Sequence, residues 1–214
     1  MQLPGCQDAA LHAQAWLPDH DPGVVIVISH GLAEHGGRYA PFAERLVARG
    51  YGVYALDHRG HGRSSGPRAN IERFSYLVSD LGTFIGRTQR QHPDAPMFLL
   101  GHSMGGGIAL AAARRNPGTL KGLVLSAPAL AAREAVPPLK ALAVRLLSRF
   151  APNTGALTLP ATAISRDPAV VRAYVSDPLV FRDAPGVRTA RECQAAHRPP
   201  VRRPVPRGLQ RTRA

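Results

Sequence analysis

The chain has 214 residues, of which 44% are hydrophobic, so it can bury one sizeable core and is expected to be an ordinary globular protein. Its net charge of +13 would suit a nucleic-acid partner, but eight arginines and a single acid lie in residues 187–214, which leaves 19 basic and 13 acidic residues elsewhere. Arginine also outnumbers lysine 25 to 2, a bias typical of GC-rich coding. We therefore expect no nucleic-acid binding.

Two cysteines, Cys6 and Cys193, are too few and too far apart to suggest a disulfide framework or a zinc site. The N-terminus lacks a basic region followed by a long apolar stretch, and no segment has the length of a membrane span. These features predict a cytoplasmic location without stable membrane insertion.

Two strands are expected before residue 30. Leu11–Leu17 alternates apolar and polar residues, which predicts a half-exposed edge strand, whereas Val24–Ile28 is a β-branched run typical of a strand buried on both faces of a parallel sheet. The second strand leads into His30 and Gly31. The Leu32 N–H that follows is a candidate oxyanion donor. We expect His30 to hold this loop by hydrogen bonds rather than to act as a catalytic base.

A helix and a strand are expected next. Gly36–Gly50 has apolar residues at helical spacing and ends in glycine, which predicts an amphipathic crossover helix. The strand Tyr51–Leu56 leads into the polar, Gly-rich stretch Asp57–Gly66, at the sheet edge where α/β proteins bind ligands. His58 and His61 lie there, but no further ligand completes a metal set, so we expect a hydrogen-bonded loop without a metal.

The strongest signal is Gly101–Gly105, a Gly-x-Ser-x-Gly turn between the apolar run Met97–Leu100 and the Ala-rich, helix-forming stretch Gly106–Arg115. Such a turn exposes the serine Oγ above the sheet, which makes Ser103 a candidate nucleophile. Met104 opens the helix, so its N–H is a candidate oxyanion donor that the helix dipole assists. The alternative is a Gly-rich turn that merely contains a serine.

Strands and helices alternate up to residue 128, with a helix predicted over Phe74–Gln91 and a further buried strand over Lys121–Ser126. This order predicts an α/β fold, a mostly parallel sheet with helices on both faces. Then the alternation breaks, because Pro137–Phe150 and Asp167–Phe181 are both helix-like with no strand between them. We interpret residues from about 129 to 182 as a helical cap that forms a lid over an apolar substrate; the alternative is a plain helical insertion.

Three segments carry a resemblance to a known family, and they are His30–Tyr39, Asp57–Ser64 and Gly101–Gly106. Together they resemble the monoacylglycerol lipase and lysophospholipase family of α/β-hydrolases, which is similar to the serine aminopeptidases. The resemblance spans roughly residues 11–185 and includes Ser176–Leu179, which resembles the close of the family's cap. It implies an α/β-hydrolase fold, Ser103 as nucleophile, Met104 and Leu32 as oxyanion donors, and a cap that admits one acyl chain. We expect no cofactor.

The triad acid and histidine of this fold follow the serine in the chain, on loops after two further strands. His197 is the only histidine after Ser103, and Asp177 would satisfy the order with it. However, His197 lies in a Pro- and Arg-rich segment, and the resemblance gives Asp177 a role in the cap. Residues 187–214 lack any β-branched run and are expected to be a disordered basic tail. The α/β-hydrolase domain would then be residues 1–186, without its last strands.

Two functions follow from this interpretation. In the first, the chain is a serine hydrolase of monoacylglycerol-like or lysophospholipid-like esters, impaired by the missing acid and histidine. In the second, it is a non-catalytic truncated remnant that at most binds acyl lipid. A perhydrolase or an aminopeptidase stays open, and the oligomeric state is not fixed. A reading-frame shift in GC-rich DNA would explain the tail, and another frame would then encode the missing acid and histidine loops.

Overall fold

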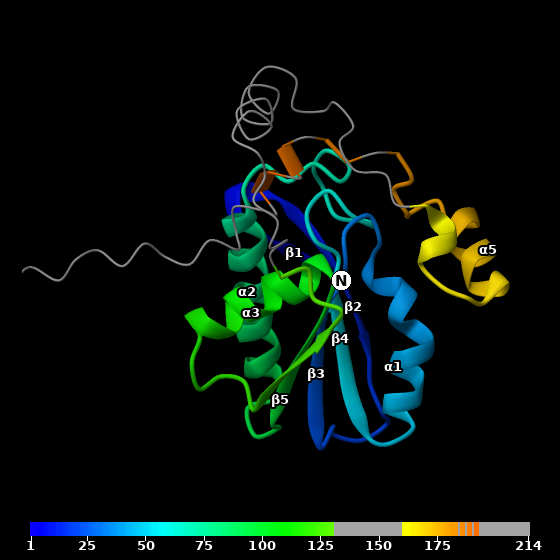
Figure 1. Ribbon diagram of the computed structural model, residues 1–214. Coiled ribbons are helices and arrows are strands. Elements are labelled where there is room, and N and C mark those ends of the chain that lie inside the picture. Colours follow the sequence, from blue (N-terminus) through cyan, green and yellow to red (C-terminus); the bar gives the residue numbers. More distant parts are fainter. Residues whose placement is uncertain (131–159, 184, 187, 190, 193–214) are drawn as a thin grey trace, which may run out of the picture.

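A computed structural model describes residues 1–130, 160–183, 185–186, 188–189 and 191–192 (Figure 1). Its six strands form one sheet in the order β1-β2-β4-β3-β5-β6. The strands are β1 (Gln2–Pro4), β2 (Ala10–Trp16), β3 (Val24–Ser29), β4 (Tyr51–Leu56), β5 (Met97–His102) and β6 (Gly122–Ser126). The helices are α1 (Ala40–Val47), α2 (Phe74–Gln91), α3 (Met104–Arg115) and α5 (Pro168–Ser176), with short 3-10 turns at η1 (Cys6–Asp8), η2 (Gly36–Tyr39) and η3 (Ala161–Ala163).

The sheet is parallel from β4 through β3 and β5 to β6, while β1 and β2 pair antiparallel at its other end. Helix α1 covers one face and helices α2 and α3 cover the other (Figure 1). The larger core lies between the sheet and α2 and α3, and its largest fully buried side chain is Phe84. A smaller core under α1 packs Ala43 against Ile28, Val53 and Ala55. The predicted α/β fold with helices on both faces is confirmed.

Two expectations about the first half of the chain are wrong in detail. The strand expected at the sheet edge, β2, lies inside the sheet, because β1 pairs with its first three residues. The helix expected over Gly36–Gly50 is the 3-10 turn η2 followed by α1, which ends at Val47. Phe42, one of the apolar residues whose helical spacing predicts an amphipathic helix over residues 36–50, does not face the core, since 42% of it is exposed.

The second half of the chain departs from expectation at both the cap and the tail. The first predicted cap helix, Pro137–Phe150, lies outside the described residues, and the second forms α5, which ends at Ser176. Thr189 was placed in the disordered tail, yet it is buried at 1% exposure against the loop that precedes α2. Residues from 193 onward lie outside the described part. Within that part, no helix is both long and apolar enough to cross a membrane.

Candidate active site

Ser103 occupies the sharp turn between β5 and α3. Its φ of 52° and ψ of −120° lie in a region that non-glycine residues rarely adopt. Backbone hydrogen bonds hold it there: the Ser103 N–H donates to Ser126 O at 3.0 Å, and the Ser103 carbonyl accepts from the N–H groups of Gly106 and Ala129, each at 2.9 Å. The end of β6 therefore fixes the turn, and α3 begins at the next residue.

Glycine is required where α3 crosses the end of β3. A Cβ on Gly105 would collide with the carbonyl oxygens of Ser29 and His30. On the other side of the turn, a Cβ on Gly31 would lie 3.3 Å from the Ser103 Cβ. The loop after β3 and the Ser103 turn are thus in direct contact at the carboxyl ends of the strands.

Two backbone N–H groups flank this contact. Met104 is the first residue of α3, so its N–H has no acceptor within the helix. The Leu32 N–H and the Gly31 carbonyl belong to the same peptide plane. His30 Nδ1 orients this plane, because it donates to the Gly31 carbonyl at 2.7 Å. Since the described chain contains no cis peptide, the Leu32 N–H points opposite to that carbonyl and away from His30.

His30 has both ring nitrogens engaged. Its Nε2 accepts from the His58 N–H at 2.9 Å, so the proton must be on Nδ1, which donates to the Gly31 carbonyl. The ring is fully buried, and burial lowers its pKa despite the opposing effect of the Glu34 carboxylate. The imidazole is therefore neutral and holds the loop, as the sequence suggested, and neither nitrogen is available as a base.

His58 and His61 are buried beside His30, with ring centroids 4.5 and 5.4 Å from the His30 ring. His58 Nε2 hydrogen-bonds Ser29 Oγ at 2.9 Å, and His61 Nδ1 donates to Arg59 O at 3.0 Å. Burial lowers the pKa of His58 well below its usual value and that of His61 to about 3. Among residues whose positions are described, no three His, Cys, Asp or Glu side chains are grouped so that they could hold a metal ion.

Asp57 organises the polar loop after β4. Its buried carboxylate accepts from the Gly36 N–H at 2.8 Å through Oδ1 and from the Arg63 N–H at 2.9 Å through Oδ2. A Cβ on Gly62 would collide with this carboxylate. The loop that was expected to lie at the ligand-binding edge is thus tied to the start of η2.

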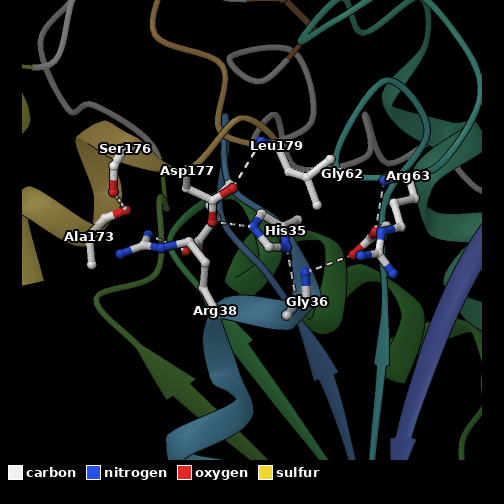
Figure 2. A network of polar contacts seen from close by, with 12 residues as sticks. His35, Gly36, Arg38, Gly62, Arg63, Ala173, Ser176, Asp177 and Leu179 are labelled. Carbon is white, nitrogen blue, oxygen red and sulfur yellow. Dashed lines mark hydrogen bonds and ion pairs between the residues drawn. The ribbon is translucent and has the colours of Figure 1, made fainter.

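Asp177, a candidate triad acid, is paired with His35 instead of a histidine beside Ser103. His35 Nδ1 accepts from the Gly37 N–H at 3.2 Å, so Nε2 carries the proton and donates to Asp177 Oδ2 at 2.8 Å (Figure 2). Although partial burial opposes it, the hydrogen bonds from His35 and from the Leu179 N–H lower the pKa of Asp177. The pair fastens the end of α5 to the loop before α1. The other candidate, His197, lies outside the described residues.

A hollow of about 120 Å³ lies next to Leu32. Its walls include Ala33, Tyr174 of α5 and Phe181, and the Phe181 N–H donates to the Ala33 carbonyl at 2.9 Å. A larger and more open hollow of about 600 Å³ lies along α2 and α3 and is lined by Arg73, Arg115, Arg191 and Glu192 among others. Leu32 lines the smaller hollow and not the larger one, whereas Ser103 lines neither.

The Ser103 hydroxyl has no hydrogen-bond partner among the residues that the structure describes. Glu34 and His35 lie in the segment His30–Tyr39 that resembles the family, and the sequence predicts no role for either of them. Glu34 accepts from the Gly31 N–H three residues earlier, and His35 contacts Asp177, which lies 142 residues further along the chain. Neither contact follows from the periodicity of the sequence.

A mostly parallel sheet with a serine held at positive φ between a strand and a helix defines an α/β-hydrolase fold. The sequence profile of the family described as "Serine aminopeptidase, S33" matches residues 20–199. This chain belongs to that family.

Individual relatives agree with this assignment. The monoacylglycerol lipase of Mycolicibacterium smegmatis is 48% identical over 165 residues, which are 77% of this chain and 59% of that protein. The monoglyceride lipase of Homo sapiens is 39% identical over 173 residues, 80% of this chain and 57% of its own length. The crystal structure of Paleococcus ferrophilus monoacylglycerol lipase superposes with a TM-score of 0.68 at 31% identity, covering 87% of this chain and 71% of that one. The chain therefore spans less than two thirds of both sequence relatives.

Proposed function

We propose that the chain carries the nucleophile and the oxyanion site of an acyl ester hydrolase acting on monoacylglycerol-like or lysophospholipid-like esters. The observation that supports this most strongly is the Ser103 turn: the Ser103 backbone has a positive φ, Met104 is the next residue and begins α3, and the loop that leads to Leu32 contacts the turn at Gly31. Relatives named as monoacylglycerol and monoglyceride lipases support the class of substrate. The hollow beside Leu32 has Arg182 and Asp183 in its walls, and its apolar side, formed by residues such as Ala33 and Phe181, suits an acyl chain.

In this proposal Ser103 Oγ attacks the ester carbonyl carbon while its proton passes to a base. The carbonyl oxygen becomes an oxyanion that accepts hydrogen bonds from the Met104 and Leu32 N–H groups, and a pair of such donors lowers the barrier by several kcal/mol. The C–O bond then breaks, the alcohol leaves with a proton, and an acyl ester on Ser103 remains. Water attacks this acyl-enzyme to release the fatty acid and regenerate the hydroxyl.

None of the described side chains is hydrogen-bonded to the Ser103 hydroxyl as a base would be. His30 and His35 each use both ring nitrogens in the scaffold, and Asp177 is bound to His35. Without a base the serine hydroxyl stays protonated and is a weak nucleophile. Removal of triad members from a serine protease lowers kcat by up to about a million-fold. We therefore propose slow acylation of Ser103 in this chain.

A fluorophosphonate probe tests the proposal directly, because it reacts once with an activated serine and needs no turnover. Intact-mass measurements over several hours should show slow, single-site labelling of the purified chain and none in Ser103→Ala. Ser75→Ala, which changes an exposed serine on α2, is the matched control and should be labelled at the parent rate. Labelling that persists in Ser103→Ala would contradict the assignment of the nucleophile. Rapid, stoichiometric labelling that is lost in Ser103→Ala would contradict the proposal that Ser103 lacks a base.

The second candidate is a non-catalytic chain that binds acyl lipid, and the lack of a partner for the Ser103 hydroxyl among the described residues favours it. Titration of a fluorescent fatty acid separates the two. Saturable binding with no labelling of Ser103 at any time would support the binding protein over the hydrolase.

A further inference from the structure

The loop from Gly31 to Ala33 carries the second oxyanion donor without belonging to any helix or strand. Ala33 has a φ of 67°, a conformation that costs a residue with a Cβ on the order of 1 kcal/mol or more. Such a loop keeps one geometry only if surrounding contacts over-determine it.

Glu34 lies under this loop with 8% of its surface exposed. Its Oε1 accepts from the Gly31 N–H at 2.6 Å and from the Tyr39 hydroxyl at 2.9 Å. Its Oε2 accepts from Arg38 Nη1 at 2.9 Å. These three donors replace the water that the carboxylate loses on burial. Their hydrogen bonds are stronger than bonds between neutral groups, because the acceptor is charged. Burial and the Glu34 carboxylate also raise the pKa of Tyr39, which keeps that hydroxyl a donor.

The two peptide planes that meet at the Gly31 Cα are therefore both fixed. Glu34 holds the N–H of the first plane, and His30 holds the carbonyl of the second, whose N–H belongs to Leu32. We propose that Glu34 is a positioning residue for the Leu32 oxyanion donor, an inference that rests on the function proposed above. Without its carboxylate the Gly31 N–H loses its acceptor and the first plane is no longer held, so the direction of the Leu32 N–H depends on the His30 hydrogen bond alone.

Arg38 extends this arrangement to the cap. Its guanidinium pairs with Glu34 and also lies over the Tyr174 ring of α5, with 4.6 Å between Cζ and the ring centroid. Figure 2 shows Arg38 between α5 and the loop before α1. Tyr174 of α5 thus contacts Arg38, Arg38 pairs with Glu34, and Glu34 accepts from the Gly31 N–H.

Three variants test the role of Glu34. Glu34→Ala removes the acceptor, Glu34→Gln keeps a neutral acceptor for the Gly31 N–H, and Glu44→Gln is the control, since it removes a carboxylate that is exposed on α1. The readouts are the Gly31 and Leu32 amide signals in ¹H–¹⁵N NMR spectra and the rate of fluorophosphonate labelling at Ser103.

We expect Glu34→Ala to move both amide signals and to slow labelling by roughly 10- to 100-fold, approaching the effect of losing one oxyanion donor. Glu34→Gln should restore the labelling rate to within about tenfold of the parent chain, because a neutral acceptor keeps most of a hydrogen bond of about 1 kcal/mol. Glu44→Gln should change neither readout. If Glu34→Ala fails to fold, Glu34→Gln tests the proposal alone. The chemical shift of the Gly31 amide proton should then move upfield, because this proton loses its charged acceptor.

The proposal and the function on which it rests fail in different ways. Unchanged Gly31 and Leu32 signals in the folded Glu34 variants, or equal labelling rates in the parent chain and Glu34→Ala, would overturn the positioning role. Complete absence of labelling in the parent chain would overturn the hydrolase function. In that case the amide signals, which need no reaction, still decide whether Glu34 orients the loop.

Discussion

Three buried histidines make the folded chain sensitive to acid. His30, His58 and His61 are buried at 2% exposure or less, and burial lowers the pKa of each one. A histidine whose pKa is lowered on folding contributes no penalty above its unfolded pKa of about 6.5, where it is neutral in both states. Below that pH the unfolded chain binds protons that the folded chain does not, so the free energy of unfolding falls until the folded pKa is reached.

We predict that the free energy of unfolding, measured by urea titration, decreases between pH 6.5 and pH 4.5. Each such histidine should contribute up to about 1.4 kcal/mol per pH unit in this window. His61→Gln should flatten the dependence, because it removes one of these buried imidazoles. His20→Gln changes an exposed histidine and should leave the slope unaltered. A free energy of unfolding that is constant over this range would contradict the prediction, because it would show that these imidazoles have the same pKa in the folded and the unfolded chain.

At the scale of elements, the start of α2 is fastened by residues more than a hundred positions further along the chain. Thr189 Oγ1 accepts from the Ile71 N–H at 2.9 Å and donates to the Ala69 carbonyl at 2.7 Å. Glu192 Oε2 accepts from the N–H of Phe74, the first residue of α2, at 3.2 Å. A carboxylate at this position satisfies a free helix N–H and complements the helix dipole. These contacts secure the loop that leads into α2.

Thr189→Val should destabilise the chain by about 1–3 kcal/mol, because it leaves the buried Ile71 N–H without an acceptor while it preserves the side-chain volume. Thermal or urea unfolding measures the loss. Thr83→Val, at an exposed position of α2, controls for the change of residue type and should stay within about 0.5 kcal/mol of the parent. Equal stability of the Thr189 variant and the parent would mean that this contact contributes nothing net.

At the scale of the whole molecule, β6 forms one edge of the sheet. Among the described strands it pairs only with β5, and Val124 in its middle is 50% exposed. An edge strand with unpaired backbone groups and an exposed apolar side chain is a template for pairing with another chain.

We predict concentration-dependent association of the chain, measured by size-exclusion chromatography with light scattering. Val124→Lys should weaken it, because a charge on an edge strand opposes pairing. Val170→Lys adds the same charge to a similarly exposed position on α5 and should leave the association unchanged. A chain that stays monomeric over the whole concentration range would count against an open edge at β6.

Local sequence patterns were sufficient for much of the framework. The β-branched run at β3, the bounds of α2 and the strand–turn–helix at Ser103 were all predicted, because each depends on side-chain periodicity or on the conformational freedom of glycine within a few residues. The parallel sheet then followed from the order of the elements. The class of fold is thus encoded in short windows of sequence.

Only the tertiary structure decided how the candidate site is held. Asp177 and Thr189 find their partners at His35 and Ile71, separated from them by 142 and 118 residues, and Glu34 is turned inward onto the Gly31 peptide. Hydrogen-bond pairing at such separations depends on which surfaces the packed sheet brings together, and single polar residues carry no periodic signal of it. The residues that form the Ser103 turn can therefore be predicted from the sequence. The residues that hold the loops around this turn are identified only by the folded structure.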